Sequence, residues 1–126
     1  MPERVLTNHE LARMVDTNDE WIVARTGISQ RYIANGRETT ASLGTAAARE
    51  ALDIADVTPD DIDLIIVATS TPEHHFPSTA SLVQDALGAR NAGAFDMLAA
   101  CTGFVYALSI AAQAIQAGAM NTVLVI

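Results

Sequence analysis

The stretch AGAFDMLAACTGFVYALSIAAQAIQAG, residues 92–118, contains the only cysteine of the 126-residue chain, Cys101. Residues 94–98 form a short apolar run that predicts a buried strand, and the residues after the cysteine show a helical period. The apolar positions of that period are Phe104, Leu108, Ala111 and Ile115. We therefore expect Cys101 at the point where a strand leads into a helix.

A cysteine at the start of a helix can act as a nucleophile. The first N–H groups of a helix have no partner within it and its dipole adds positive charge there, so a thiolate is favoured. The same N–H groups could bind the oxyanion that forms when sulfur attacks a carbonyl. Free cysteines, however, are often buried and behave as small hydrophobes. Position alone therefore leaves a catalytic and a structural role open for Cys101.

The rest of the chain alternates between helical and strand patterns. Helix starts are expected at Asn8, at Thr17 or Asn18, at Thr39 or Thr40, and at Ser78, and helix ends are expected at Gly27 and Gly88. The predicted inward residues are Leu11, Met14 and Val15 in the first helix and Leu43, Ala47, Ala51 and Ile54 in the third. A strand or an extended loop is expected at residues 28–34, and strands are expected at residues 63–69, buried on both faces, and 122–126. This alternation predicts an α/β fold with a mostly parallel sheet covered by helices.

Charge and composition exclude several classes of function. The net charge is −8 and the chain has no lysine, so a basic surface for nucleic acid is not expected. Six arginines balance six acidic residues in positions 1–49, which would direct an anionic ligand to the first third of the chain. One cysteine allows no internal disulfide, so we expect a reducing, cytoplasmic location. Residues 97–126 carry no charge, but polar residues interrupt them and we expect no membrane-spanning helix.

Two further groups of residues are candidates for binding. Trp21 and Arg25 lie four residues apart and hence on one helix face, where a base could stack on the indole and the guanidinium could meet a phosphate. Their alternative roles are those of a partly buried anchor and a surface charge. His74 and His75 are adjacent in a loop without a further ligand at suitable spacing, so no metal site is expected.

Two segments resemble the β-ketoacyl-acyl-carrier-protein synthase III family, which consists of thiolase-fold enzymes that start fatty-acid chains. They are FDMLAACTGFVYAL, residues 95–108, and VDTNDEWIVARTGISQRYIA, residues 15–34. The spacing between them fits, as do ATSTPEHHFPSTA and the closing VLVI, so the resemblance covers nearly the whole chain. The family pattern usually has a small residue where this chain has Thr102.

The resemblance implies a role for each candidate residue. Cys101 would be the nucleophile, Trp21 would stack on the adenine of coenzyme A with Arg25 beside it, and Thr17 would be a lesser polar contact. Phe76 would reach across a dimer interface into the acyl pocket of the partner subunit. A loop aromatic packed in its own core is the alternative for Phe76.

The resemblance also implies a reaction. Cys101 would take an acyl group, expected to be acetyl, from acyl-coenzyme A, and the thioester would condense with malonyl-acyl carrier protein as carbon dioxide leaves. The products would be 3-oxoacyl-carrier protein, coenzyme A and carbon dioxide. No cofactor is expected beyond the coenzyme A thioester that serves as substrate. A cytoplasmic homodimer active in fatty-acid biosynthesis is the corresponding expectation.

Compared with this family, residues 1–126 are expected to form an incomplete N-terminal half of a thiolase-like fold, without the first strand and the C-terminal half. The missing half would include a histidine and an asparagine of the active site, so the isolated chain is expected to be inactive. Two alternatives remain open. One is another thiolase-fold condensing enzyme, such as a polyketide starter synthase or a hydroxymethylglutaryl-coenzyme A synthase-like protein, and the other is a non-catalytic fragment.

Overall fold

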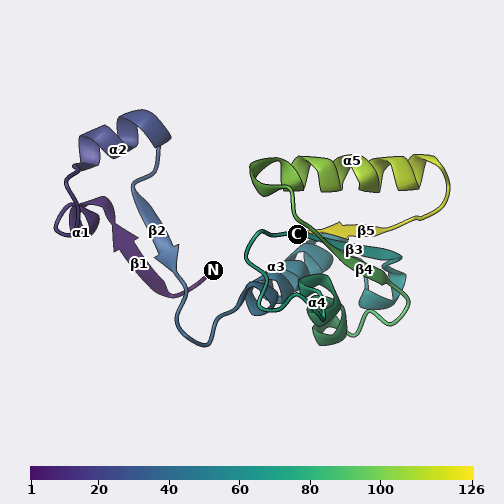
Figure 1. Cartoon of the computed structure of the whole chain (residues 1–126). Coiled ribbons are helices and arrows are strands. Elements are labelled where there is room, and N and C mark those ends of the chain that lie inside the picture. Colours follow the sequence, from purple (N-terminus) through teal and green to yellow (C-terminus); the bar gives the residue numbers. More distant parts are fainter. The chain divides into compact units, whose positions relative to one another are not determined.

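A computed structural model describes all residues, 1–126, and divides the chain into two compact units (Figure 1). The first unit is residues 1–38 and the second is residues 39–126.

The first unit is a two-stranded antiparallel sheet with two short helices. Its elements are β1 (Arg4–Thr7), α1 (Asn8–Leu11), α2 (Asp19–Thr26) and β2 (Gln30–Ile33). Arg4 pairs with Ile33 at one end of the sheet and Thr7 with Gln30 at the other. Residues 28–34, predicted as a strand or an extended loop, contain the strand β2, whereas β1 was not predicted.

Asn8 has a different role from the helix cap that we expected. Thr7 caps α1 instead, in a capping box with Glu10. Asn8 is only 1% exposed, and its Nδ2 donates to the Asp19 carboxylate and to the Ile28 carbonyl, both at 2.8 Å. Its Oδ1 accepts a hydrogen bond of 2.8 Å from Arg31. The buried amide of Asn8 therefore joins both helices to the strand pair.

The prediction that Met14 and Val15 face inward is wrong. α1 ends at Leu11, so both residues lie beyond the helix and are 64% and 55% exposed. The second helix agrees better with expectation, because Asn18 caps α2 through Trp21 N–H and Gly27 ends it in the left-handed conformation.

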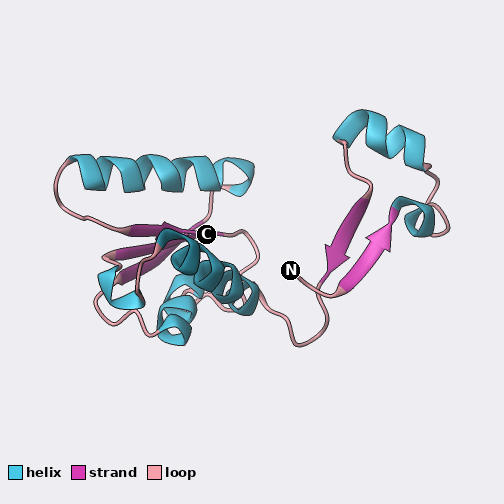
Figure 2. Cartoon of the chain, turned by 180° about the vertical axis from the view of Figure 1, so that it is seen from behind, coloured by secondary structure: helices cyan, strands magenta, loops and turns pink.

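The second unit has three layers. Its elements are α3 (Thr40–Ala55), η1 (Pro59–Asp61), β3 (Leu64–Ala68), α4 (Thr79–Leu87), β4 (Gly93–Met97), η2 (Ala100–Thr102), α5 (Gly103–Gln116) and β5 (Val123–Val125). The strands are parallel in the order β4-β3-β5. Helices α3 and α4 cover one face of this sheet and α5 covers the other (Figures 1 and 2). The expected α/β architecture with a parallel sheet is confirmed.

Strand β3 lies at the centre of both hydrophobic cores. Ile65 and Val67 pack with the side of the sheet that α3 and α4 cover, whereas Leu64 and Ile66 pack toward Ala107 of α5. The four side chains are at most 7% exposed, which confirms the prediction of a strand covered on both faces.

The predicted inward face of α3 is wrong by about one residue. Its buried residues are Gly44, Thr45, Ala48 and Leu52, whereas Ala47 and Ala51 are exposed and Ile54 is 81% exposed. The small residues on this face let α3 lie directly against Val83 of α4 and against Ile126. A Cβ on Gly44 would be 3.4 Å from Ile126 and 3.6 Å from Val83. An alanine-rich helix has apolar residues on several faces, so its period does not select the one that packs closest.

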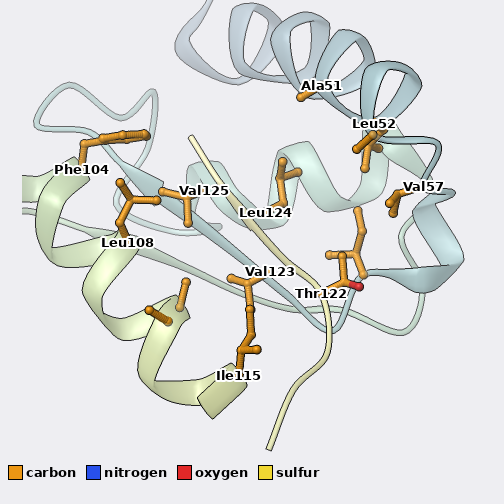
Figure 3. Close-up of a pocket in the computed structure, with 14 residues that line it drawn as sticks. Ala51, Leu52, Val57, Phe104, Leu108, Ile115, Thr122, Val123, Leu124 and Val125 are labelled. Carbon is orange, nitrogen blue, oxygen red and sulfur yellow. The ribbon is translucent and has the colours of Figure 1, made fainter. Parts of the chain in front are cut away.

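An open apolar groove surrounds the free edge of β5 (Figure 3). Its volume is about 490 Å³, and side chains from α3, α5 and β5 line it. Phe104, Leu108 and Ile115 of the predicted helical stripe lie in the groove, and they are 52%, 47% and 45% exposed. The helical period of α5 was predicted correctly. Of its apolar stripe, however, only Ala111 is buried, and the other three side chains are about half exposed.

Asp63 connects the start of β3 to the start of β5. Its Oδ2 accepts hydrogen bonds from the N–H groups of Asn121 at 2.6 Å and Thr122 at 3.1 Å. The Asn121 bond, followed by the Thr122 bond, lowers the pKa of Asp63 from its ordinary 3.8. The ionised carboxylate therefore favours the folded state above pH 3.8, and this contribution is lost as the pH falls through the lower folded-state pKa.

Replacing Asp63 with Asn should make the chain less stable at about pH 6, because a neutral amide oxygen accepts weaker hydrogen bonds than a carboxylate. The difference from the parent chain should shrink as the pH falls to about 3, toward the lowered pKa of Asp63. Urea unfolding at several pH values measures this difference. Other titrating carboxylates act equally in both proteins and cancel. Asp85→Asn, at an exposed position on α4, is the matched control. A difference that stays constant across this pH range would contradict the role of the Asp63 charge.

Candidate active site

Cys101 lies between strand β4 and helix α5, as predicted. It is exposed and sits in the short 3-10 helix η2, two residues before α5 begins at Gly103. Thr102 does not cap α5, because its hydroxyl and its N–H both bond to the Ala99 carbonyl, at 2.8 and 3.2 Å. The thiol therefore stands free of the core, and a role as a buried small hydrophobe is excluded in this structure.

The backbone before the cysteine is strained. Ala100 has a φ of 45°, in the left-handed region that a residue with a Cβ rarely occupies. Such a conformation costs about 1–2 kcal/mol and persists only where surrounding contacts enforce it. Strain of this kind next to an exposed thiol is typical of a functional site.

Gly103 allows the first turn of α5 to lie against the end of β3. A Cβ on Gly103 would come within 3.2 Å of the Ala68 Cβ, and 3.9 Å from the Met97 carbonyl. A glycine at position 103 therefore lets protein atoms of β3 come this close. This contact holds the start of α5, and with it the Cys101 turn, close to the end of β3.

Gly103→Ala should lower the free energy of unfolding by about 1–2 kcal/mol, since the overpacking cost exceeds the gain in helix propensity. Denaturant unfolding measures the change. Gly36→Ala is the control, because nothing lies within 4 Å of a Cβ there. Equal stability of the two variants would show that the Ala68 contact does not hold the turn.

Phe76 lies in the loop between β3 and α4 and is 90% exposed. This exposure rules out the alternative that Phe76 packs in a core formed by residues 1–126. β3 and β4 are adjacent parallel strands, so the Phe76 loop and the Cys101 turn both leave the sheet at its carboxyl edge. In α/β proteins this edge is where ligands bind.

The structure brings Thr17, Trp21 and Arg25 together in the first unit. Trp21 is 54% exposed and forms, with Asp16, Thr17 and Asn18, a cavity of about 220 Å³. The Thr17 hydroxyl is buried and has no hydrogen-bond partner. The Arg25 guanidinium lies over the indole, 5.0 Å from the ring centroid, in a cation–π arrangement.

This geometry changes one expectation for the pair. We expected the indole to take a base while the guanidinium met a phosphate, whereas Arg25 itself covers one face of the Trp21 ring. A planar ligand would then stack on the opposite face or displace the guanidinium. Trp21 and Arg25 belong to the first unit, and Phe76 and Cys101 to the second.

Two carboxylates near the candidate site were not singled out from the sequence. Asp96 of β4 accepts hydrogen bonds from the N–H groups that begin α4, and Glu73 accepts one from Ala41 at the start of α3. An isolated acidic residue in an apolar strand, such as Asp96 in GAFDM, is the signal that could have pointed to the first of them.

No group of three or more histidine, cysteine or carboxylate side chains is arranged to hold a metal ion. His74 and His75 are both exposed in the Phe76 loop. None of the helices combines the length and apolar character that crossing a membrane requires.

The sequence around Cys101 and the fold of the chain both match known condensing enzymes. A family model described as 3-oxoacyl-[acyl-carrier-protein] synthase III matches residues 95–126, which include Cys101, α5 and β5. The crystal structure of 3-oxoacyl-[acyl-carrier-protein] synthase III from Aquifex aeolicus VF5 superimposes with a TM-score of 0.92 at 53% identity, covering 99% of this chain and 40% of that one. The priming β-ketosynthase of the R1128 polyketide pathway gives 0.92 at 47% identity, covering 98% and 37%. The fold is that of the thiolase-like condensing enzymes.

Sequence comparison adds curated relatives that share one description. Beta-ketoacyl-[acyl-carrier-protein] synthase III of Sinorhizobium medicae is 61% identical over 126 residues, which are 100% of this chain and 39% of the relative. The protein of the same description from Agrobacterium fabrum is 60% identical, with the same coverage. The chain is similar to proteins of this description over its whole length. It spans about two fifths of the length of the curated relatives that it matches.

Proposed function

We propose that this chain carries the nucleophile and the acyl-donor site of a synthase III acyltransferase, which condenses acyl-coenzyme A with malonyl-acyl carrier protein. The observation that carries the proposal is Cys101, exposed at the junction of β4 and α5 at the carboxyl edge of a parallel sheet. The names of the relatives support the reaction class.

In the first half of the proposed reaction, the Cys101 thiolate attacks the thioester carbonyl of acyl-coenzyme A. A new carbon–sulfur bond forms, the bond to the coenzyme A sulfur breaks, and that sulfur leaves as a thiolate that takes up a proton. The positive end of the α5 dipole, two residues away, stabilises the attacking sulfur anion. The exposure of Cys101 leaves it open to a large thioester.

The acyl donor is bound in this proposal by the first unit. The free face of the Trp21 indole accepts the adenine, and the Arg25 guanidinium is the nearby cation for a phosphate. The unpartnered Thr17 hydroxyl, in the same cavity as Trp21, supplies a polar contact. Five of the seven arginines of the chain lie in the first unit, which gives this unit its cations for an anionic donor.

The second half of the proposed reaction rests on the resemblance and on the names of the relatives. Malonyl-acyl carrier protein loses carbon dioxide, and the resulting carbanion equivalent attacks the Cys101 thioester to release 3-oxoacyl-carrier protein. Acetyl-coenzyme A as primer, a cytoplasmic location and a homodimer complete the proposal. The single cysteine, which can form no internal disulfide, supports a reducing compartment.

A chimera tests the nucleophile, in which residues 1–126 replace the matching segment of the Aquifex aeolicus synthase III. Incubation with labelled acetyl-coenzyme A should leave the label on the protein, and Cys101→Ser should abolish it because a serine hydroxyl is far less nucleophilic at neutral pH. Intact-protein mass spectrometry measures the acyl-enzyme. Retention of the label in Cys101→Ser would disprove the assignment.

Loss of the stacking surface should weaken binding of the donor in the same chimera. Trp21→Ala should raise KM for acetyl-coenzyme A by about 5- to 150-fold, the effect of losing roughly 1–3 kcal/mol of base stacking, with little change in kcat. Steady-state kinetics measure both constants. Tyr32→Ala, which removes an exposed aromatic of the same unit, is the control. Equal KM values for the two variants would place the adenine elsewhere.

The likeness to the R1128 priming β-ketosynthase supports a second candidate, the priming of a polyketide. Both candidates use the same cysteine, so Cys101 variants do not distinguish them. Product analysis with malonyl-carrier protein and with malonyl-coenzyme A, each with short and branched primers, does so. Preference for an acetyl primer and the carrier protein favours the fatty-acid reaction.

A further inference from the structure

Thr102, the residue after the cysteine, makes the only side-chain hydrogen bond among residues 98–103. Its hydroxyl donates to the Ala99 carbonyl at 2.8 Å, and its N–H donates to the same oxygen at 3.2 Å. A carbonyl oxygen has two lone pairs and can accept both bonds at once. The two bonds span the residues between their ends, which are Ala100 and Cys101.

The hydrogen bond of the Thr102 hydroxyl has the strength needed to hold a strained neighbour in place. Ala100 has a φ of 45°, and this left-handed conformation is disfavoured by about 5- to 30-fold for a residue with a Cβ. One hydrogen bond of ordinary strength changes the balance between two conformations by about 2- to 13-fold. The bond therefore offsets much of the strain at Ala100, and a side chain without a hydroxyl at position 102 could not make it.

The Thr102 hydroxyl also leaves the start of α5 without a side-chain cap. A threonine before a helix usually accepts a hydrogen bond from an N–H group of the first turn. The hydroxyl of Thr102 instead donates back to Ala99 and makes no such bond. The N–H groups and the positive end of the helix dipole then remain available to a sulfur anion at this point. The exposed thiol of Cys101 lies there.

We propose that Thr102 is a positioning residue, whose hydroxyl bond to Ala99 holds the turn that presents the Cys101 thiol at the start of α5. Without this bond, Ala100 can relax toward negative φ, and the backbone of the next residue moves with it. The thiol then spends a smaller fraction of the time where an acyl donor reaches it. This inference rests on the proposed function, in that acyl transfer to the thiol is the reaction measured.

The test compares Thr102→Val with Thr102→Ser in the Aquifex chimera. Valine keeps the shape of threonine without the hydroxyl, whereas serine keeps the hydroxyl. Thr102→Val should lower the maximal rate of acyl-enzyme formation by about 2- to 13-fold, the effect of one lost hydrogen bond. The concentration of acetyl-coenzyme A that gives half of this rate should not change, because donor binding is not affected. Thr102→Ser should keep the rate of the parent chimera. Single-turnover mass spectrometry measures both quantities.

A second measurement does not require acyl transfer. The rate at which iodoacetamide alkylates Cys101, followed in the peptide that contains it, should fall by a similar factor in Thr102→Val and not in Thr102→Ser. Thr45→Val is the matched control, because the Thr45 hydroxyl also donates to a carbonyl at 2.8 Å, that of Ala41 in α3. α3 covers the opposite face of the sheet from α5, so this variant should leave both rates unchanged. Thr102→Ala, which also lacks the hydroxyl, replaces Thr102→Val if the valine variant does not fold.

Ala100→Gly tests whether the hydroxyl bond acts against the strain. Glycine adopts a positive φ at little cost, so Thr102→Val should have a smaller effect on both rates when residue 100 is glycine. Equal rates in Thr102→Val and Thr102→Ser, or an equal effect of Thr102→Val in both backgrounds, would overturn the inference. A parent chimera that forms no acyl-enzyme would instead disprove the proposed function, and the alkylation rates would still decide the role of Thr102.

Discussion

The burial of β3 on both faces is the constraint on which the second unit depends. Ile65 and Ile66, adjacent in sequence, are fully buried on opposite sides of the sheet. Helices must therefore cover both faces, and a parallel sheet needs helical crossovers that return each strand to the same end. The parallel direction of β3 and β4 in turn puts the Phe76 loop and the Cys101 turn at one edge.

Much of this architecture could be predicted from local patterns. The four apolar residues at positions 64–67 indicated β3, Ser78 and Gly88 marked the limits of α4, and Gly27 ended α2 as expected. Failures occurred where packing rather than pattern decides. The inward face of α3 depends on which of its small residues lie against Val83 and Ile126, and the role of Asn8 depends on partners 11 to 23 residues away.

The candidate site could be predicted only in part, for a similar reason. Cys101 was found from its place between a strand and a helix, which is a local property. The strain at Ala100 and the hydrogen bonds of Asp96 depend on the folded backbone, and no single stretch of sequence shows them. The cation–π contact of Arg25 with Trp21 was compatible with the four-residue spacing, but the spacing does not specify which face the guanidinium covers.

The connections after β3 and β4 leave the sheet at the same end, and this arrangement allows related proteins to differ in the molecules they accept. The strands and the helix faces that cover them provide the stability. The segments that contain Phe76 and Cys101 are short connections between those elements. Mutations in the connections can alter which molecule is accepted while the sheet keeps its pairing. A 3-oxoacyl-[acyl-carrier-protein] synthase III and a polyketide priming β-ketosynthase share one scaffold in this way, as their equal TM-scores of 0.92 to this chain illustrate.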